Sequence, residues 1–175
     1  MIKHGTATVR QARPADLVLI AALIRGLAEY ENHTQDFSLD VDELNRHLFG
    51  PKPFAEVLIA ELGEEPIGFA LFFHNYSTFL GKPGIYMEDL FVLPSHRGCG
   101  AGRALLTRLA EIAIERDCAR LEWSVLKWNK EAVGFYHHLG AAADDDRNTY
   151  RIAGKPLFEL ASASKQSKGR NPDVS

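Results

Sequence analysis

Apolar residues along this chain recur at two spacings, and each spacing predicts a different kind of element. Intervals of three and four, which indicate amphipathic helices, cover residues 14–30, 38–48 and 102–116. Alternating or continuous apolar runs bounded by glycine and proline predict strands. The expected strands are residues 6–12, 54–62, 67–75, 87–93, 120–126, 149–152 and 155–160. This order predicts an antiparallel front half followed by a strand–helix–strand unit, and therefore a mixed sheet of the α/β (α+β) class.

Composition adds the expectation of one ordinary globular domain. The chain has 175 residues, of which 46% are hydrophobic and 25% are charged, enough to bury a core. We expect this single domain to cover residues 1–160. From Ala161 onward Ser, Lys, Gly, Asn and Pro dominate without an apolar period. That composition predicts a disordered C-terminal tail over residues 161–175.

Charge and cysteine content narrow the classes of partner. The formal net charge of −3 gives no electrostatic footprint for nucleic acid. The longest apolar run near the start, residues 17–24, is far too short to span a bilayer, and no secretory signal peptide is visible. Cys99 and Cys118 are too few and too far apart for a zinc site or a disulfide framework. We therefore expect a cytoplasmic protein with no metal, no nucleic-acid partner and no membrane partner.

The most specific chemistry follows the strand at residues 87–93. Gly98, Gly100 and Gly102 alternate with other residues just where a helix begins. Glycines let backbone N–H groups converge, and a helix N-terminus adds its dipole, so the turn predicts a site for phosphate or pyrophosphate. No Lys followed by Ser or Thr comes after Gly102, which argues against a P-loop. Arg103 stands where a dinucleotide fingerprint needs its third glycine, which weakens that alternative.

The loop resembles a known cofactor motif. The run Arg97-Gly98-Cys99-Gly100-Ala101-Gly102 is similar to the acetyl-CoA pyrophosphate loop of the GCN5-related N-acetyltransferase (GNAT) superfamily. Downstream, Asn129, Phe135-Tyr136 and Gly140-Ala141 resemble the second cofactor-binding motif of the same superfamily. The segments at residues 86–92, 128–129 and 27–31 resemble its diamine (spermidine/spermine) and thialysine acetyltransferase branch. The resemblance extends over about residues 6–152.

This resemblance implies a fold, a cofactor and a set of cofactor contacts. The GNAT fold is a central mixed, mostly antiparallel sheet of about seven strands, flanked by about four helices, with a splayed strand pair that holds acetyl-CoA. Acetyl-CoA would be a co-substrate, and family resemblance alone implies a homodimer. The implied cofactor-binding residues are Leu90, Phe91, Val92, Arg97, Gly98, Cys99, Gly100, Ala101, Gly102, Arg103, Asn129, Ala132 and Tyr136. Capping of a helix by Asn129 would also account for that residue.

Two side chains fit the proton transfers of acetyl transfer to an amine. An alkyl amine with a pKa of about 10 is almost fully protonated near neutral pH, so its proton must be removed. The branch uses a glutamate at the position of Glu88, which we expect to be embedded among Met87, Leu90 and Phe91 and to act as the base. A paired strand-end carboxylate is the alternative. Tyr136 is the expected general acid for the leaving thiolate, and membership of an apolar helix face is its alternative.

The sequence indicates the amine that would accept the acetyl group less specifically than it indicates the cofactor. In the diamine branch a Tyr-Glu pair matching Tyr30 and Glu31 lines the substrate groove, with Glu88 nearby; an exposed helix end is the alternative. Where that branch has Glu-Gly-Trp-Arg, this chain has Asn148-Thr149-Tyr150-Arg151, which puts spermidine or spermine in doubt. The expected activity is acetyl-CoA-dependent acetylation of the primary amine of a small molecule, of polyamine, diamine or lysine-analogue type. The alternatives are a non-catalytic acyl-CoA-binding module, against which Glu88 and Tyr136 argue, and an acetyltransferase acting on a protein amine.

Overall fold

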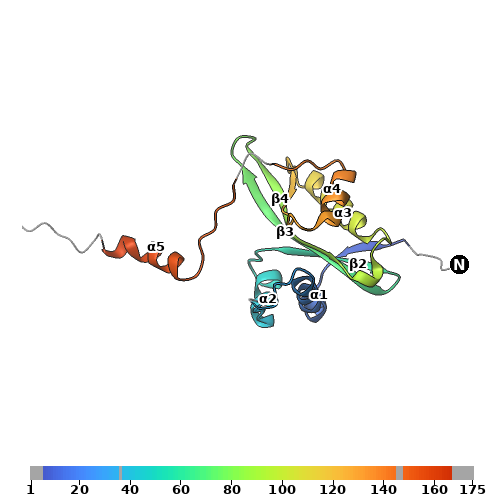
Figure 1. Cartoon of the computed structure of the whole chain (residues 1–175), viewed down its shortest axis with the longest axis horizontal. Coiled ribbons are helices and arrows are strands. Elements are labelled where there is room, and N and C mark those ends of the chain that lie inside the picture. Colours follow the sequence, from blue (N-terminus) through green and yellow to red (C-terminus); the bar gives the residue numbers. More distant parts are fainter. Residues whose placement is uncertain (1–5, 36, 145–147, 167–175) are drawn as a thin grey trace, which may run out of the picture. The chain divides into compact units, whose positions relative to one another are not determined.

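A computed structural model of the chain describes residues 6–35, 37–144 and 148–166. The chain divides into two compact parts, Met1–Leu126 and Lys127–Ser175. The first part contains the sheet and the helices α1, α2 and α3, and the second contains α4 and α5 (Figure 1).

The first part is built on one mixed sheet in the order β1-β2-β3-β4-β5. Its strands are β1 (Thr8–Gln11), β2 (Glu56–Leu62), β3 (Glu65–Ser77), β4 (Lys82–Val92) and β5 (Leu121–Trp123). Neighbours from β1 to β4 pair antiparallel, and β5 joins β4 in parallel after the α3 crossover. The predicted mixed, mostly antiparallel sheet is therefore confirmed, but the described residues form five strands rather than about seven.

Helices cover both faces of this sheet (Figure 1). Helices α1 (Leu17–Tyr30) and α2 (Val41–Phe49) lie on one face, and α3 (Ala101–Glu115) lies on the other. Asp40 caps α2, because its side chain accepts hydrogen bonds from the Asp42 and Glu43 amides. Asn32, with a φ of 59°, follows the last turn of α1 in a left-handed conformation that asparagine tolerates. The first part thus has three layers, two of helix with the sheet between them.

The core beneath α1 and α2 fixes the position of β4 relative to the first helix. Its buried members are Ala12, Ile20, Leu23, Leu48, Val57, Ile59, Phe69 and Phe91. Full burial of a large apolar side chain contributes roughly 1.5–3 kcal/mol, so this cluster is a main source of stability. A Cβ on Gly26 would lie 3.1 Å from the ring of Phe91, a tight contact, so glycine at this position helps α1 to lie close to β4.

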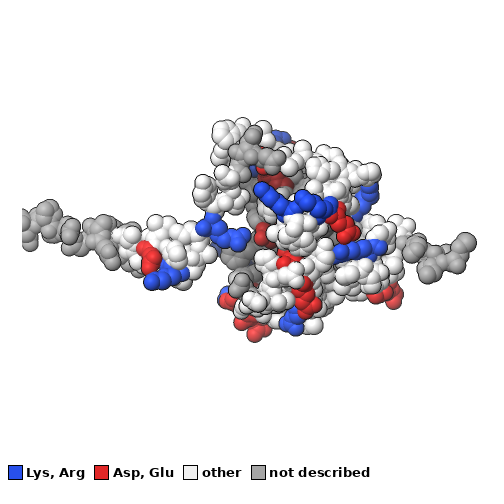
Figure 2. Space-filling model, in the orientation of Figure 1, with Lys and Arg blue, Asp and Glu red and all other residues white. Residues whose placement is uncertain are grey.

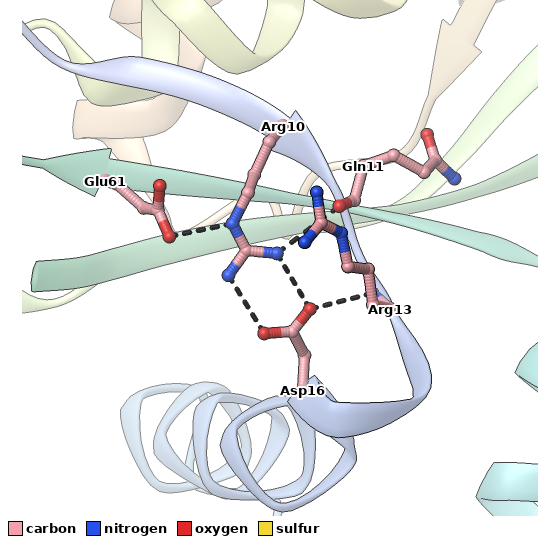
Figure 3. Close-up of polar contacts among 5 residues, drawn as sticks. All are labelled: Arg10, Gln11, Arg13, Asp16 and Glu61. Carbon is pink, nitrogen blue, oxygen red and sulfur yellow. Dashed lines mark hydrogen bonds and ion pairs between the residues drawn. The ribbon is translucent and has the colours of Figure 1, made fainter. Parts of the chain in front are cut away.

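An arginine ties the start of α1 to the first two strands (Figure 3). Arg10 on β1 donates through Nε to Glu61 on β2 at 2.8 Å, and through both Nη atoms to Asp16 at 2.7 and 2.9 Å. Asp16 also accepts from the Arg13 amide at 2.7 Å, which closes the 3-10 turn Pro14–Asp16. The hydrogen bond from Arg10 lowers the pKa of Asp16 below its usual range. The network orients α1 and therefore its far end, which carries two predicted site residues.

The second part corrects one prediction. Residues 155–160, expected as half of a hairpin with residues 149–152, belong to the helix α5 (Lys155–Gln166), and residues 148–152 form neither helix nor strand. Lys155 and Glu159 form an i,i+4 ion pair at 3.5 Å, an arrangement that supports a helix. Of the predicted tail, residues 161–166 are part of α5, and residues 167–175 lie outside the described residues. Among the described helices, none has the length and apolar character of a membrane span.

Candidate active site

The glycine loop joins β4 to α3 through the 3-10 turn Pro94–His96. Gly98 and Gly100 have φ values of 79° and 90°, the left-handed region that side chains disfavour. Gly100 is the N-cap of α3, and its carbonyl accepts the first helical bond from the Ala104 amide at 2.9 Å. The backbone amides in the first turn of α3 have no hydrogen-bond partners within the helix. The loop therefore ends in a cluster of backbone donors at the positive end of the α3 dipole.

Open space lies over this loop. A Cβ added to Gly98 or Gly100 would meet no heavy atom within 4 Å. Arg97 and Arg103, at the two ends of the loop, are both exposed, and Cys99 between them is a half-buried free thiol. Guanidinium groups and aligned backbone amides are suitable donors for phosphate oxygens. The residues present thus fit the pyrophosphate of a cofactor such as acetyl-CoA.

A β-bulge in β4 decides which of two neighbouring acids, Glu88 or Asp89, is the more shielded from solvent. Leu71 on β3 pairs with Asp89, but the next residue, Phe72, pairs with Met87, so Glu88 is the extra residue. Paired residues share a face of the sheet and successive residues alternate, so Met87 and Asp89 point to opposite faces. The expectation that Glu88 is embedded in apolar surroundings is wrong, because Glu88 is exposed, whereas Asp89 is half-buried.

The bulge also coincides with the end of the β4–β5 pairing. In the described part of the chain, β5 pairs with β4 only at Ile85, Tyr86 and Met87. Residues 90–92 of β4 continue to pair with residues 68–70 of β3 on their other side. β4 therefore extends past β5, as the predicted splayed strand pair requires. The edge of residues 90–92 that faces away from β3 carries backbone groups able to bind an extended ligand with amides.

Three carboxylates interact on the α1 side of β4. The pKa of Asp89 is raised to about 6, first by burial and then by the charges of Glu88 and Glu31. Burial also raises the pKa of Glu31, against the opposing charge of His33. Neighbouring carboxylates that disfavour each other's ionisation are relieved when a cation binds among them. The acid cluster Glu31, Glu88 and Asp89 is thus suited to an ammonium group.

Sequence reasoning identified two members of this cluster and missed Asp89. The alternation of side chains along the strand could have indicated Asp89. Asp89 precedes the apolar Phe91 by two residues, so both side chains lie on the same face of the sheet. Phe91 is 3% exposed and belongs to the core under α1. An acid on the face of such a residue is sheltered by the same helix.

Tyr30, at the end of α1, connects the acid cluster with the glycine loop. Its ring packs on Phe91 with centroids 6.5 Å apart and an interplanar angle of 48°. The guanidinium carbon of Arg97 lies 4.3 Å from the centre of the same ring, within the range of a cation–π contact. Glu31 is the next residue and forms the C-cap of α1. The fold therefore brings together Tyr30, Glu31 and Arg97, three of the predicted site residues.

Comparison with known proteins decides the family. The model of the Acetyltransferase (GNAT) family matches residues 22–141. This chain belongs to the GNAT family. It is 35% identical over 164 residues to thialysine N-epsilon-acetyltransferase from Bos taurus, covering 87% of this chain and 96% of the relative. It is 36% identical over 127 residues to an L-ornithine N5-acetyltransferase from Arabidopsis thaliana, covering 73% of this chain and 52% of that protein.

Solved structures agree with the GNAT fold. An integron cassette protein from the mobile metagenome of V. cholerae superposes with a TM-score of 0.74 at 28% identity, covering 89% of this chain and 98% of that chain. A metagenomic aminoglycoside acetyltransferase superposes with a TM-score of 0.71 at 21% identity, covering 86% and 97%. The second likeness shows the fold alone. Together with the family match, these comparisons make the protein an N-acetyltransferase of a family that uses acetyl-CoA.

The GNAT match includes the remaining candidates, which lie in the second part on α4 (Lys130–His138) or at its N-cap. Asn129 accepts a hydrogen bond from the Ala132 amide at 3.1 Å, so its predicted capping role is confirmed. Tyr136 is half-buried, and its ring centre lies 5.4 Å from that of Phe135. Ala132 and Tyr136 are four residues apart and therefore share a face of the helix.

Acidic and basic residues nearly balance in this GNAT protein, whose formal net charge is −3. Figure 2 shows acidic and basic side chains interspersed on the face seen there. Among the residues that the structure describes, no group of three or more His, Cys, Asp or Glu has the arrangement of a metal site. The acid cluster next to α1 is thus a local feature rather than part of a generally acidic surface.

Proposed function

We propose that this protein transfers the acetyl group of acetyl-CoA to the primary amine of a small molecule that carries a second positive charge, of polyamine, diamine or lysine-analogue type. The acid cluster beside the glycine loop carries this proposal. Thialysine and ornithine, which name two of its relatives, both contain more than one amino group. A second ammonium needs a counter-charge that is not consumed in the reaction, and Glu31 and Asp89 supply it.

The acetylated amine must be uncharged when it attacks the thioester. Glu88, exposed at the bulge, takes its proton through water, while Asp89 and Glu31 hold the other end of the substrate. Backbone N–H groups along residues 90–92 stabilise the oxyanion that develops on the thioester carbonyl. Tyr136 donates a proton to the departing thiolate. As the C–N bond forms and the C–S bond breaks, nitrogen loses two protons in all. The ammonium proton leaves to solvent through Glu88, and the second proton, also passed to water, balances the one that sulfur receives from Tyr136.

The proposed role of Tyr136 is tested by removing its hydroxyl alone. Tyr136→Phe should lower kcat by about ten- to ten-thousandfold, because the ring is kept and only the proton donor is lost. Acetyl-CoA affinity, measured by calorimetry, should change little. An unchanged kcat would mean that the thiolate takes its proton from another group.

The acceptor is tested with a panel of amines by following CoA release. Diamines and lysine analogues should give a kcat/KM at least roughly tenfold above monoamines of equal length, because the second ammonium meets a sheltered carboxylate. Asp89→Asn should reduce this preference. Acetylation of peptide amines only would point to a protein acceptor, and acetyl-CoA binding without turnover to a non-catalytic module.

We also extend the proposal to assembly and location. Family resemblance alone supports a homodimer, and the sequence features described above support the cytoplasm. Sedimentation at micromolar concentration should give a species of twice 19.5 kDa. A 19.5 kDa species alone would contradict the dimer.

A further inference from the structure

Arg97 is the first residue of the phosphate-binding loop, yet its guanidinium rests on a residue from a different element. The ring of Tyr30 lies beneath it, 4.3 Å from the guanidinium carbon. Tyr30 belongs to the last turn of α1, while Arg97 follows β4 and the 3-10 turn Pro94–His96. The contact therefore joins the end of the first helix to the start of the cofactor loop.

The ring that supports Arg97 is itself held in place. Tyr30 is half-buried and packs on Phe91, which is 3% exposed and part of the core under α1. The amide of the next residue, Glu31, donates to the Leu27 carbonyl at 2.9 Å, so the backbone at this point is still held by the helix. Arg97, in contrast, is an exposed residue with a long side chain. A fixed aromatic face restricts the rotamers of such a side chain before any ligand arrives.

Restricting a side chain in advance affects how tightly a ligand binds. Ordering a long side chain during binding opposes association, and a side chain already held in place avoids that cost. Phosphate oxygens recognise a guanidinium through its planar donor geometry, so the orientation of the group matters as well as its charge. An aromatic platform contributes to both effects, because contact with its face limits the positions open to the guanidinium.

We propose that Tyr30 is a positioning residue for the cofactor, whose ring holds the Arg97 guanidinium ready for the phosphates of acetyl-CoA. This role differs from lining the amine groove, which was the role expected for Tyr30 from family resemblance. It rests on the proposed function only in taking acetyl-CoA as the ligand of the loop. Tyr30 acts through Arg97 and need not touch the cofactor.

The first test compares two substitutions of Tyr30 in the full chain. Tyr30→Phe keeps the aromatic face, so the acetyl-CoA Kd measured by calorimetry should stay within about threefold of the native value. Tyr30→Leu removes the face and should weaken acetyl-CoA binding by roughly 3- to 30-fold. Native acetyl-CoA affinity in Tyr30→Leu, with only the amine KM raised, would overturn the proposal and leave Tyr30 as a groove residue.

A double-mutant cycle separates action through Arg97 from general damage. In an Arg97→Gln background, Tyr30→Leu should change the acetyl-CoA Kd by less than about twofold, because the group that it positions is gone. Arg103→Gln is the matched control, since it removes a guanidinium from the other end of the loop. There Tyr30→Leu should retain its full effect. An equal penalty in the native and Arg97→Gln backgrounds would overturn the proposal.

An acetyl donor without phosphates separates loss of phosphate binding from structural damage, because structural damage would lower activity with either donor. With an acetyl thioester of cysteamine as donor, the loss of kcat/KM in Tyr30→Leu should be several-fold smaller than the loss with acetyl-CoA, because Arg97 then has no phosphate to bind. With acetyl-CoA, the same variant should show a raised KM and a nearly native kcat. An equal loss with both donors would overturn the positioning role. Failure of the native chain to bind acetyl-CoA would instead overturn the proposed function.

Discussion

The glycine loop and the acid cluster are adjacent halves of one candidate site, but they are constructed differently. The loop is a continuous stretch, residues 97–102, and its ligand-binding groups are backbone amides at the positive end of α3. The acid cluster joins side chains of α1 and β4, and its charges repel one another. The loop is therefore sensitive to any change in backbone shape, whereas the cluster is sensitive to pH and to single side-chain charges.

The largest expected effect comes from distorting the loop. Gly100→Val places a branched side chain at a φ of 90° and in the space over the loop, so acetyl-CoA affinity should fall by at least about a hundredfold. The rise in melting temperature that acetyl-CoA produces should disappear. Gly63→Val is the matched control, because Gly63 also has a positive φ, 66°, with open space around it in the β2–β3 turn. It should lose some stability yet keep the acetyl-CoA response; equal losses in both variants would show that strain alone is responsible.

A smaller effect should follow from Glu88→Gln, which tests the exposed member of the cluster. If Glu88 removes the amine proton, kcat should fall by roughly 10- to 100-fold near neutral pH. The defect should shrink as the pH approaches the amine pKa of about 10, where the free amine needs no base. The measurement is a pH profile of kcat for both proteins. A defect that stays constant from neutral to alkaline pH would make Glu88 a binding carboxylate.

The smallest expected effect is on the free energy of unfolding and comes from replacing Asp89, the less exposed of the two β4 acids. The pKa of Asp89 is raised to about 6 in the folded protein, from a usual value of 3.8. Folding therefore disfavours its ionised form, and the destabilisation develops as pH rises between these two values. Asp89→Asn should accordingly raise the free energy of unfolding by about 3 kcal/mol near neutral pH, and leave it almost unchanged below the usual Asp pKa.

Denaturant melts of Asp89→Asn across this pH range provide the measurement, with Glu88→Gln as the neighbouring control. Glu88 is exposed and its charge is a smaller cause of the raised Asp89 pKa than burial is, so Glu88→Gln should give a smaller gain near neutral pH than Asp89→Asn and almost none in acid. A stability gain for Asp89→Asn that is the same in acid and at neutral pH would show that ionisation is not its cause. A gain in stability in Glu88→Gln but not in Asp89→Asn would mean that Glu88, and not Asp89, is the acid whose ionisation destabilises the fold.

Features that depend on neighbours in the sequence were predicted correctly. The glycine loop needs left-handed backbone at Gly98 and Gly100 followed by a helix start, and both follow from residue types within a few positions. The Asn129 cap is local in the same sense. The helical period of α1 and α3 also reports directly on which face each helix buries. For these elements the side-chain pattern and the backbone preference agree, so no distant contact is needed to choose among conformations.

Only the tertiary structure decided the identity of the sheltered acid, because the bulge at Glu88 is a property of the register between β3 and β4. Pairing over many residues sets that register, and one extra residue reverses the faces of everything beyond it. The same limit explains α5, since a short apolar segment suits a strand or a helix until a pairing edge is present or absent. It also explains the stack of Arg97 on Tyr30, which joins two segments distant in sequence. Residue types determined the chemistry available to this protein, whereas strand register and helix packing determined which of those groups meet.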